Sequence, residues 1–239
     1  FSPVPGPRLL LRDPADAPAL LAAAEAVVDQ NGLSSAHATF VEERELELFR
    51  AAGWLIRIGT QFHWQNRGYS DFDHFLAALS SRKRKAIRKE RAAAQAAVRI
   101  VQIAGTDITP DMWDAFWVFY QDTGARKWGQ PYLTRSFFDI IGESMKDSIV
   151  LFLAYDGATP VAGALNFASP DCLYGRYWGC TRDIPFLHFE LCYYQAVDYA
   201  IDHGLPRVEA GAQGEHKLAR GYEPVPTYSA HYIANNGFR

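Results

Sequence analysis

Residues 149–180 read Ile-Val-Leu-Phe-Leu-Ala-Tyr-Asp-Gly-Ala-Thr-Pro-Val-Ala-Gly-Ala-Leu-Asn-Phe-Ala-Ser-Pro-Asp-Cys-Leu-Tyr-Gly-Arg-Tyr-Trp-Gly-Cys. This apolar stretch, rich in β-branched and aromatic residues and broken at Asp156-Gly157, predicts strands over 149–155 and 161–167. A five-residue connection would join them as a hairpin. Residues 172–180 predict a third strand. We therefore expect a β-sheet here, with the rest of the chain arranged around it.

The segments on either side alternate between helical and strand patterns. After the hairpin we expect a helix over 187–203, ended by Gly204 and Pro206, and a strand at 207–210. A short helix near 215–220 and a last strand at 228–233 follow. Before the hairpin the pattern predicts the following elements: helices at 14–30, 42–52, 71–97, 111–122 and 135–146, and strands at 36–41, 54–64 and 99–103. This mixture predicts an α/β (α+β) protein with a mixed sheet.

Composition limits the class of protein. The chain has 239 residues, of which 14% are aromatic and 21% charged, which is typical of a globular protein. It has no apolar run of 18 residues, so we expect no membrane span. Its three cysteines form no CxxC pair, which favours reduced thiols and a cytoplasmic location, and no His/Cys spacing predicts a metal. Phe1 is not a methionine and the end follows a strand pattern, so we expect further sequence beyond both ends.

Two parts of the chain share an order of elements: helix, Gly-Leu, strand, short helix, Gly-aromatic, strand. Gly53-Trp54 and Gly221-Tyr222 lie 168 residues apart, as do His63-Trp64 and His231-Tyr232. We interpret this as two copies of one domain, with residues 1–66 the C-terminal half of the first and residues 67–239 the second. The long helix 71–97 would lie at their junction.

The element order of the second copy resembles the GNAT acyltransferase fold, and the tandem resembles the Fem-type aminoacyltransferases. Six blocks together resemble the bacterial peptidoglycan biosynthesis/recognition family of N-acyltransferases: residues 1–8, 62–64, 81–91, 174–178, 188–190 and 211–217. The resemblance spans nearly the whole chain. It implies acyl transfer to an amine, with an acyl-CoA such as acetyl-CoA or an aminoacyl-tRNA as the donor. A cell-wall precursor would be the acceptor. We expect no metal.

A basic cluster at residues 82–91 holds seven cations and one acid, so the rest of the chain has a net charge of −9. It favours an anionic substrate, tRNA phosphate or anionic lipid, although a solvated helix face has the same pattern. The candidate substrate-binding residues are Arg82, Lys83, Arg84, Lys85 and Arg88. Helical periodicity turns Lys83 and Glu90 toward the body, so we expect Lys83→Ala to impair ligand binding more than Lys85→Ala.

Two loops could accept the pyrophosphate of an acyl-CoA, which GNAT folds bind through backbone N–H groups before a helix. In the first copy this place falls on Gly6 and Arg8, although two neighbouring prolines remove donors and favour a rigid turn. In the second copy it falls on residues 180–186, which lack a glycine-rich stretch. We therefore expect the second copy to bind the acceptor.

Strand 172–180 carries further candidates. Strict alternation would put Leu173, Gly175, Tyr177 and Gly179 on one face, with Arg176 and Trp178 on the other as substrate-binding residues. Tyr177 could protonate the leaving thiolate, although most strand tyrosines only pack.

The last candidates lie in residues 188–217. Glu190, in a first helical turn, and Glu209, on a strand, are candidate general bases, although the helix dipole favours Glu190 there in any case. The stretch Glu209-Ala-Gly-Ala-Gln-Gly-Glu-His-Lys217 adds Glu215 and His216 as bases and Gln213 and Lys217 as substrate-binding residues. His216 could equally be a surface histidine.

Two functions fit these patterns. The first is an N-acyltransferase, in which one of these bases takes the proton of an attacking amine. The second is a non-catalytic recognition module that binds an anionic polymer or precursor on the same fold. The sequence leaves the oligomeric state undetermined.

Overall fold

The computed structural model describes residues 4–126, 131–235 and 237. The chain forms two compact units, one of Phe1–Gln61 with Pro224–Arg239 and a larger one of Phe62–Glu223. Among the described helices, none is both long and apolar enough to cross a membrane.

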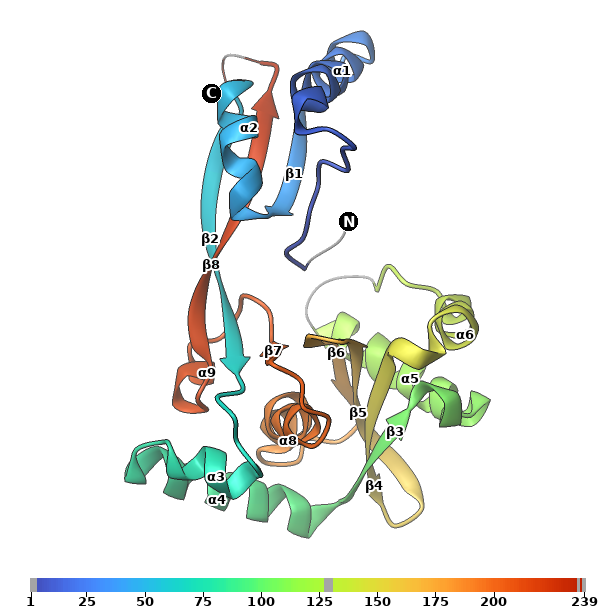
Figure 1. The fold of residues 1–239 in the computed structure, drawn as a ribbon. Coiled ribbons are helices and arrows are strands. Elements are labelled where there is room, and N and C mark those ends of the chain that lie inside the picture. The colour runs from blue at the N-terminus through green and yellow to red at the C-terminus, as the bar shows by residue number, and fades with distance from the viewer. Residues whose placement is uncertain (1–3, 127–130, 236, 238–239) are drawn as a thin grey trace. The chain divides into compact units, whose positions relative to one another are not determined.

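The smaller unit packs one long helix and one short helix on three strands (Figure 1). Its elements are η1 (Pro14–Asp16), α1 (Ala17–Gln30), β1 (Ser35–Val41), η2 (Glu43–Glu45), α2 (Leu46–Ala51), most of β2 (Leu55–Gln65) and β8 (Glu223–Ile233). The strand order is β1-β8-β2, and β1 pairs with β8 antiparallel. Leu21, Phe49 and Trp54 are central to its core.

The larger unit begins with two helices where the sequence predicted one. α3 (Phe72–Ala77) and α4 (Ser81–Ala97) are separated because Ser80 is extended, with ψ of 150°, and its hydroxyl accepts from the amide of Lys83 as an N-cap. The Arg84 guanidinium then donates to the carbonyl oxygens that end α3, those of Leu76, Ala77 and Leu79. The predicted continuous helix over 71–97 was therefore wrong.

Strands in the order β2-β7-β6-β5-β4-β3 form the mixed sheet at the centre of this unit. The strands not yet given are β3 (Arg99–Ala104), β4 (Ile149–Asp156), β5 (Thr159–Ser169), β6 (Cys172–Cys180) and β7 (Arg207–Glu209). Only the β6–β7 pair is parallel among the pairings described. The β4–β5 hairpin is tighter than predicted, because Asp156 pairs with Thr159 and leaves a two-residue loop.

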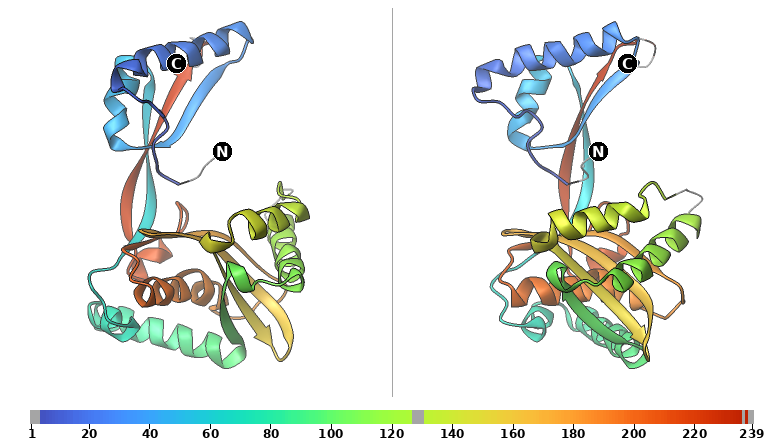
Figure 2. Two further views of the ribbon diagram at one scale, coloured as in Figure 1. Left: turned by 45° about the vertical axis from the view of Figure 1, so that its right-hand side comes forward. Right: turned by 90° about the vertical axis from the view of Figure 1, so that its right-hand side faces the viewer.

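Helices cover both faces of this sheet (Figures 1 and 2). α5 (Pro110–Arg126) and α6 (Arg135–Ser144) bury Phe116 and Phe138 against one face. The other face carries α3, α4 and the run formed by α7 (Leu187–Phe189), a π-helical segment (Glu190–Tyr194) and α8 (Gln195–Asp202). The remaining short elements are η3 (Gly105–Asp107), η4 (Lys146–Ser148) and α9 (His216–Ala219). The predicted α/β class with a mixed sheet is confirmed.

A β-bulge interrupts β6. Leu165 pairs with Tyr177 and Asn166 with Gly175, so Arg176 is an extra residue in the ladder. Because a bulge breaks the two-residue alternation, Leu173 packs in the core on the α8 side, whereas Tyr177 packs on the α5 side. The predicted shared face of Leu173 and Tyr177 was therefore wrong.

The predicted repeat corresponds to matching element orders, α1-β1-α2-β2 and α8-β7-α9-β8. β2 and β8 each have 11 residues, and each follows a glycine with positive φ, Gly53 at 79° and Gly221 at 83°. The pairing is exchanged between the two sets, since β8 pairs with β1 and β2 pairs with β7. The two compact units are defined by contacts within the folded chain, and such contacts say nothing about ancestry. The descent of the chain from two copies of one domain, with a boundary after residue 66, therefore stays a prediction.

Candidate active site

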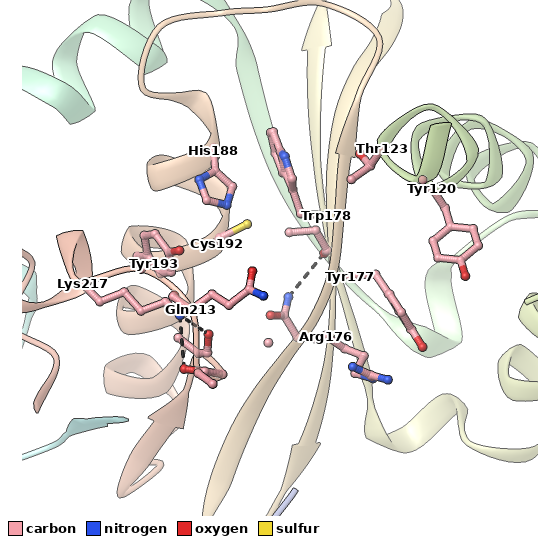
Figure 3. A pocket seen from close by; sticks show the side chains of 18 of the residues that line it. Tyr120, Thr123, Arg176, Tyr177, Trp178, His188, Cys192, Tyr193, Gln213 and Lys217 are labelled. Atoms are coloured by element: carbon pink, nitrogen blue, oxygen red, sulfur yellow. Dashed lines mark hydrogen bonds between the residues drawn. The ribbon is translucent and has the colours of Figure 1, made fainter. Parts of the chain in front are cut away.

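The candidate site is a cavity of about 800 Å³ within the larger unit, at the point where β6 and β7 separate. Their described ladder ends at the pair Tyr174–Glu209. Beyond it β6 continues beside β5, while the chain after β7 turns away through the glycines at 211 and 214. Figure 3 shows the side chains that converge on this space from β6, the π-helical segment and the loop after β7.

The β6 wall carries Arg176, Tyr177 and Trp178, the three residues that the sequence singled out on this strand. The Tyr177 hydroxyl lies 2.8 Å from that of Tyr132, which also accepts a 3.1 Å hydrogen bond from Arg176 Nη2. The Arg176 guanidinium stacks on the Tyr177 ring at 4.6 Å. Burial first, and then Tyr132, raise the pKa of Tyr177, so its phenol keeps its proton at neutral pH.

The opposite wall comes from α7 and the π-helical segment, which present His188, Cys192 and Tyr193. In a π-helical turn the backbone hydrogen bond joins residues i and i+5, whereas in an α-helix it joins residues i and i+4. Such π turns are frequent at functional sites. Trp178 packs its ring edge-on against His188 at 5.2 Å, so the two walls touch at one end of the cavity.

His216, at the start of α9, contacts Tyr193 on the same wall of the cavity. Its Nε2 lies 3.1 Å from the Tyr193 hydroxyl, and its ring also packs on Phe189. Burial, then the charges of Arg220 and Lys217, lower the pKa of His216 below its usual 6.5. The imidazole is therefore neutral at pH 7 and can accept a proton.

Lys217 is 3% exposed and closes the floor of the cavity. Its ammonium group donates to the carbonyl oxygens of Ala210 at 2.6 Å, Gly211 at 3.2 Å and Gln213. These bonds occupy all three ammonium protons, so Lys217 holds the loop 210–214 in shape (Figure 3). Burial lowers its pKa to about 8.

The two predicted carboxylate bases Glu190 and Glu209 do not line this cavity. Glu190 is fully buried and accepts from Gln95 at 2.9 Å and Gln195 at 2.8 Å, while Arg91 lies 3.3 Å away. Glu209 pairs with Arg207 at 3.1 Å, and the Nε2 atom of His63 lies 3.9 Å from its carboxylate. Both carboxylates are thus held in internal ion-pair networks.

Glu215 and the basic helix also lie outside the cavity lining. Glu215 is exposed and precedes α9 as its N-cap residue. Four predicted substrate-binding residues of α4 are exposed, namely Arg82, Lys83, Lys85 and Arg88, and Arg84 is half-buried against the end of α3. Lys83 does turn toward the body, donating to the Leu218 carbonyl oxygen at 2.8 Å, and Glu90 binds Arg220 at 2.8 Å.

The predicted donor loop around Gly6 and Arg8 is a braced turn in the smaller unit. The backbone amides of Arg8 and Leu9 both donate to Glu45 Oε1 at 2.8 Å, so a carboxylate already holds these donors. The Arg8 side chain donates to the Thr39 carbonyl oxygen at 2.8 Å and to neighbouring carbonyls. The nearby cavity of about 420 Å³ is mainly apolar. The structure thus does not bring Gly6 and Arg8 to an anion site.

Sequence reasoning missed Tyr193, Cys192, Tyr132 and Asn166 as cavity residues. The π turn decides which residues of the helix face inward, and no helical periodicity signals it. Tyr132 lies between two predicted helices, and residues 127–130 before it lie outside the described part. No cluster of three or more potential metal ligands occurs among the described side chains.

The whole chain, residues 1–239, matches the FemAB-like family model, described as peptidoglycan biosynthesis/recognition. The protein therefore belongs to this family, in agreement with the resemblance noted in the sequence. No curated protein matches it by sequence comparison.

Solved structures share its fold at low identity. FemX has a TM-score of 0.60 at 13% identity, covering 92% of this chain and 77% of FemX. The C-terminal domain of a protein named as a lysylphosphatidylglycerol synthetase, from Agrobacterium fabrum, has a TM-score of 0.66 at 13% identity, covering 95% and 76%. A tandem GNAT protein from the clavulanic acid biosynthesis pathway has 0.53 at 16%, covering 94% and 72%. The fold is thus of the GNAT type found in Fem-like proteins.

Proposed function

We propose that the protein is an N-acyltransferase that moves an acyl or aminoacyl group onto an amine, with the reaction in the cavity between β6 and β7. The observation that carries the proposal is the neutral His216 beside Tyr193 in a cavity that also contains the protonated Tyr177. Family membership and the shared fold support the class of reaction. An acyl-CoA or an aminoacyl-tRNA would be the donor, and a cell-wall precursor the acceptor.

The proposed step is a direct attack. The amine nitrogen adds to the carbonyl carbon of a thioester or ester, a C–N bond forms, and the C–S or C–O bond breaks. His216 takes the proton of the amine, and Tyr177 gives its proton to the leaving thiolate or alkoxide. Backbone N–H groups of β6 beyond Tyr174, where the ladder to β7 ends, would stabilise the oxyanion.

The proposed setting is the cytoplasm. Cys172 is a buried free thiol, and thiols stay reduced there. An acyl-CoA pool and charged tRNA are both cytoplasmic donors, so the two donor hypotheses share this location.

The test is a transfer assay with mass-spectrometric detection of the acylated amine. Acetyl-CoA, succinyl-CoA and alanyl-tRNA serve as donors, and nucleotide-linked muramyl peptides with a free amine serve as acceptors. We expect His216→Ala to lower the rate 100-fold or more, since general acid–base groups typically contribute 10²–10⁴-fold. His203→Gln is the matched control, because His203 is exposed and stacks on Tyr199 outside the cavity.

The pH dependence gives a second readout. Because the pKa of His216 is lowered, the neutral base is present above that pKa, and the rate should fall as the pH drops through a value below 6.5. A His216→Ala enzyme that keeps the wild-type rate and pH profile would refute this role.

A second function, recognition without catalysis, is favoured by one observation: neither Glu190 nor Glu209 reaches the cavity. In that case precursors would raise the melting temperature and no donor would give product. Stabilisation by an acyl donor together with product formation supports the transferase instead.

A further inference from the structure

Arg176 differs from the other inward-facing arginines of the larger unit. Arg91 contacts Glu190 and Asp198, Arg207 contacts Asp171 and Glu209, and Arg220 contacts Glu90. Arg176 is half-buried and lines the cavity, but no described carboxylate lies within 4.0 Å of it. Burying a guanidinium without an opposite charge is costly unless a ligand supplies one.

The charge of the described cavity lining also favours an anionic ligand. Two of its described lining residues are cations, Arg176 and Lys217, and none of them is a carboxylate. Lys217 has its hydrogen bonds satisfied by neutral carbonyl oxygens, so its positive charge is not compensated there. The described lining is therefore net positive, and a low-dielectric cleft of one sign concentrates ligands of the other sign.

Arg176 is also held ready for a ligand. Its guanidinium lies over the Tyr177 ring at 4.6 Å, and one nitrogen donates to the Tyr132 hydroxyl at 3.1 Å. Stacking and this hydrogen bond fix the plane of the Arg176 guanidinium. Its other N–H groups remain as donors for a planar or tetrahedral anion. The side chain begins at the bulge of β6, which aims it into the cavity next to Tyr177 (Figure 3).

We propose that Arg176, braced by Tyr132 and Tyr177, binds a carboxylate or phosphate group of the substrate. The cavity consequently favours substrates that carry this anion and discriminates against groups that bring a positive charge into it, such as a lysyl side chain. This rests on the proposed function for the reaction itself, but the anion site is testable by binding alone.

The test compares matched probes by calorimetry on the whole chain. The pairs are uridine 5′-diphosphate with uridine, for phosphate, and N-acetylglutamate with N-acetylglutamine, for carboxylate; N-acetyllysine is the cationic probe. The three amino-acid probes are Nα-acetylated α-carboxamides, so that only the side chain carries a charge. We expect at least one anionic probe to bind more tightly than its neutral partner and more tightly than N-acetyllysine. Arg176→Gln should weaken it about 10- to 100-fold, as for a hydrogen bond to a charged group.

Two further variants keep the inference falsifiable. Arg182→Gln is the matched control, since Arg182 is exposed, pairs with Asp156 and does not line the cavity, and it should bind like wild type. Gln213→Glu puts a carboxylate into the lining and should weaken the anionic probe and strengthen N-acetyllysine. Unchanged binding in Arg176→Gln with an unchanged melting temperature, or no preference between anionic and neutral probes, would overturn the inference.

The two proposals can fail separately. Anion binding that depends on Arg176, without transfer from any donor, supports the anion site and counts against the transferase. Transfer that depends on His216 but proceeds equally well in Arg176→Gln, and equally well with cationic acceptors, supports the transferase and overturns the anion site.

Discussion

His63 is a buried histidine whose partner is a carboxylate on the neighbouring strand. It faces Glu209 in the β2–β7 ladder, and its side chain is 7% exposed. Burial, and then the charge of Arg207, lower the pKa of His63 to about 4. The ring is therefore neutral in the folded protein at pH 7 and must be protonated or exposed when the pH falls.

We expect this histidine to make the protein sensitive to acid. The folded state binds fewer protons at His63 than the unfolded state between pH 6.5 and 4, so stability falls as the pH drops through that window. The loss is about 3 kcal/mol, since one pKa unit corresponds to roughly 1.4 kcal/mol. His63→Gln should remove this part of the slope.

The measurement is urea unfolding of both proteins at pH 7, 5.5 and 4.5. Burial raises the pKa of Glu209, which acts in the opposite sense, so the difference between the two proteins is the quantity of interest. Parallel stability–pH curves for the two proteins would show that His63 does not titrate in this way.

Single residues also show where sequence reasoning stops. His216, Tyr177 and Arg176 could be predicted as cavity residues because glycines and polar groups surround them in sequence. Glu190 could not be assigned, because the groups that hold it, Arg91 and Gln95, lie about a hundred residues away on another helix. Whether a carboxylate faces a ligand or an arginine depends on such distant partners.

Helix α4 shows that prediction from sequence is limited in the same way for a whole element. The sequence predicted its basic character and the inward direction of Lys83 and Glu90. Both side chains contact the segment around α9, at Leu218 and Arg220, but Lys83 remains exposed to solvent. The sequence did not predict the break at Ser80, because a serine is acceptable inside a helix and signals an N-cap only when the preceding chain turns. The β6 bulge was not predicted either, because one extra residue in a strand does not change the apolar pattern of the sequence in a recognisable way.

We therefore expect different effects from two neighbouring lysines of α4. Lys83→Ala removes the bond to the Leu218 carbonyl oxygen at the end of α9 and should cost about 0.5 to 1 kcal/mol. It should also weaken ligand binding slightly, because α9 carries His216 and Lys217. Lys85→Ala is the exposed control and should change neither property. Urea midpoints and probe affinities measure both, and equal effects in the two variants would contradict the orientation.

The molecule as a whole has three separately organised cores, one in the smaller unit and two in the larger unit. Phe49 is 1% exposed in the core of the smaller unit, and Phe138 is 0% exposed in one core of the larger unit. Each phenylalanine-to-alanine change should cost about 3 to 5 kcal/mol by leaving a cavity. We expect Phe49→Ala to reduce amide exchange protection in the smaller unit and Phe138→Ala in the larger one.

Hydrogen exchange read by mass spectrometry tests this expectation, because peptides report each unit separately. Loss of protection across both units in either variant would show that they unfold as one. The fold class and the order of elements followed from sequence, but this division did not. Long-range pairing joins β8 to β1 and β2 to β7, and it cannot be derived from local pattern.

The π turn at Glu190–Tyr194 has a consequence for comparing relatives. Such a turn contains one residue more than an α-helical turn, and one residue rotates a helix by about 100°. A relative with a regular helix here would direct the counterparts of Cys192 and Tyr193 elsewhere, so its alignment with this chain should open a one-residue gap within 187–202. That single inserted residue would then mark, from sequence alone, the relatives that share this wall of the cavity.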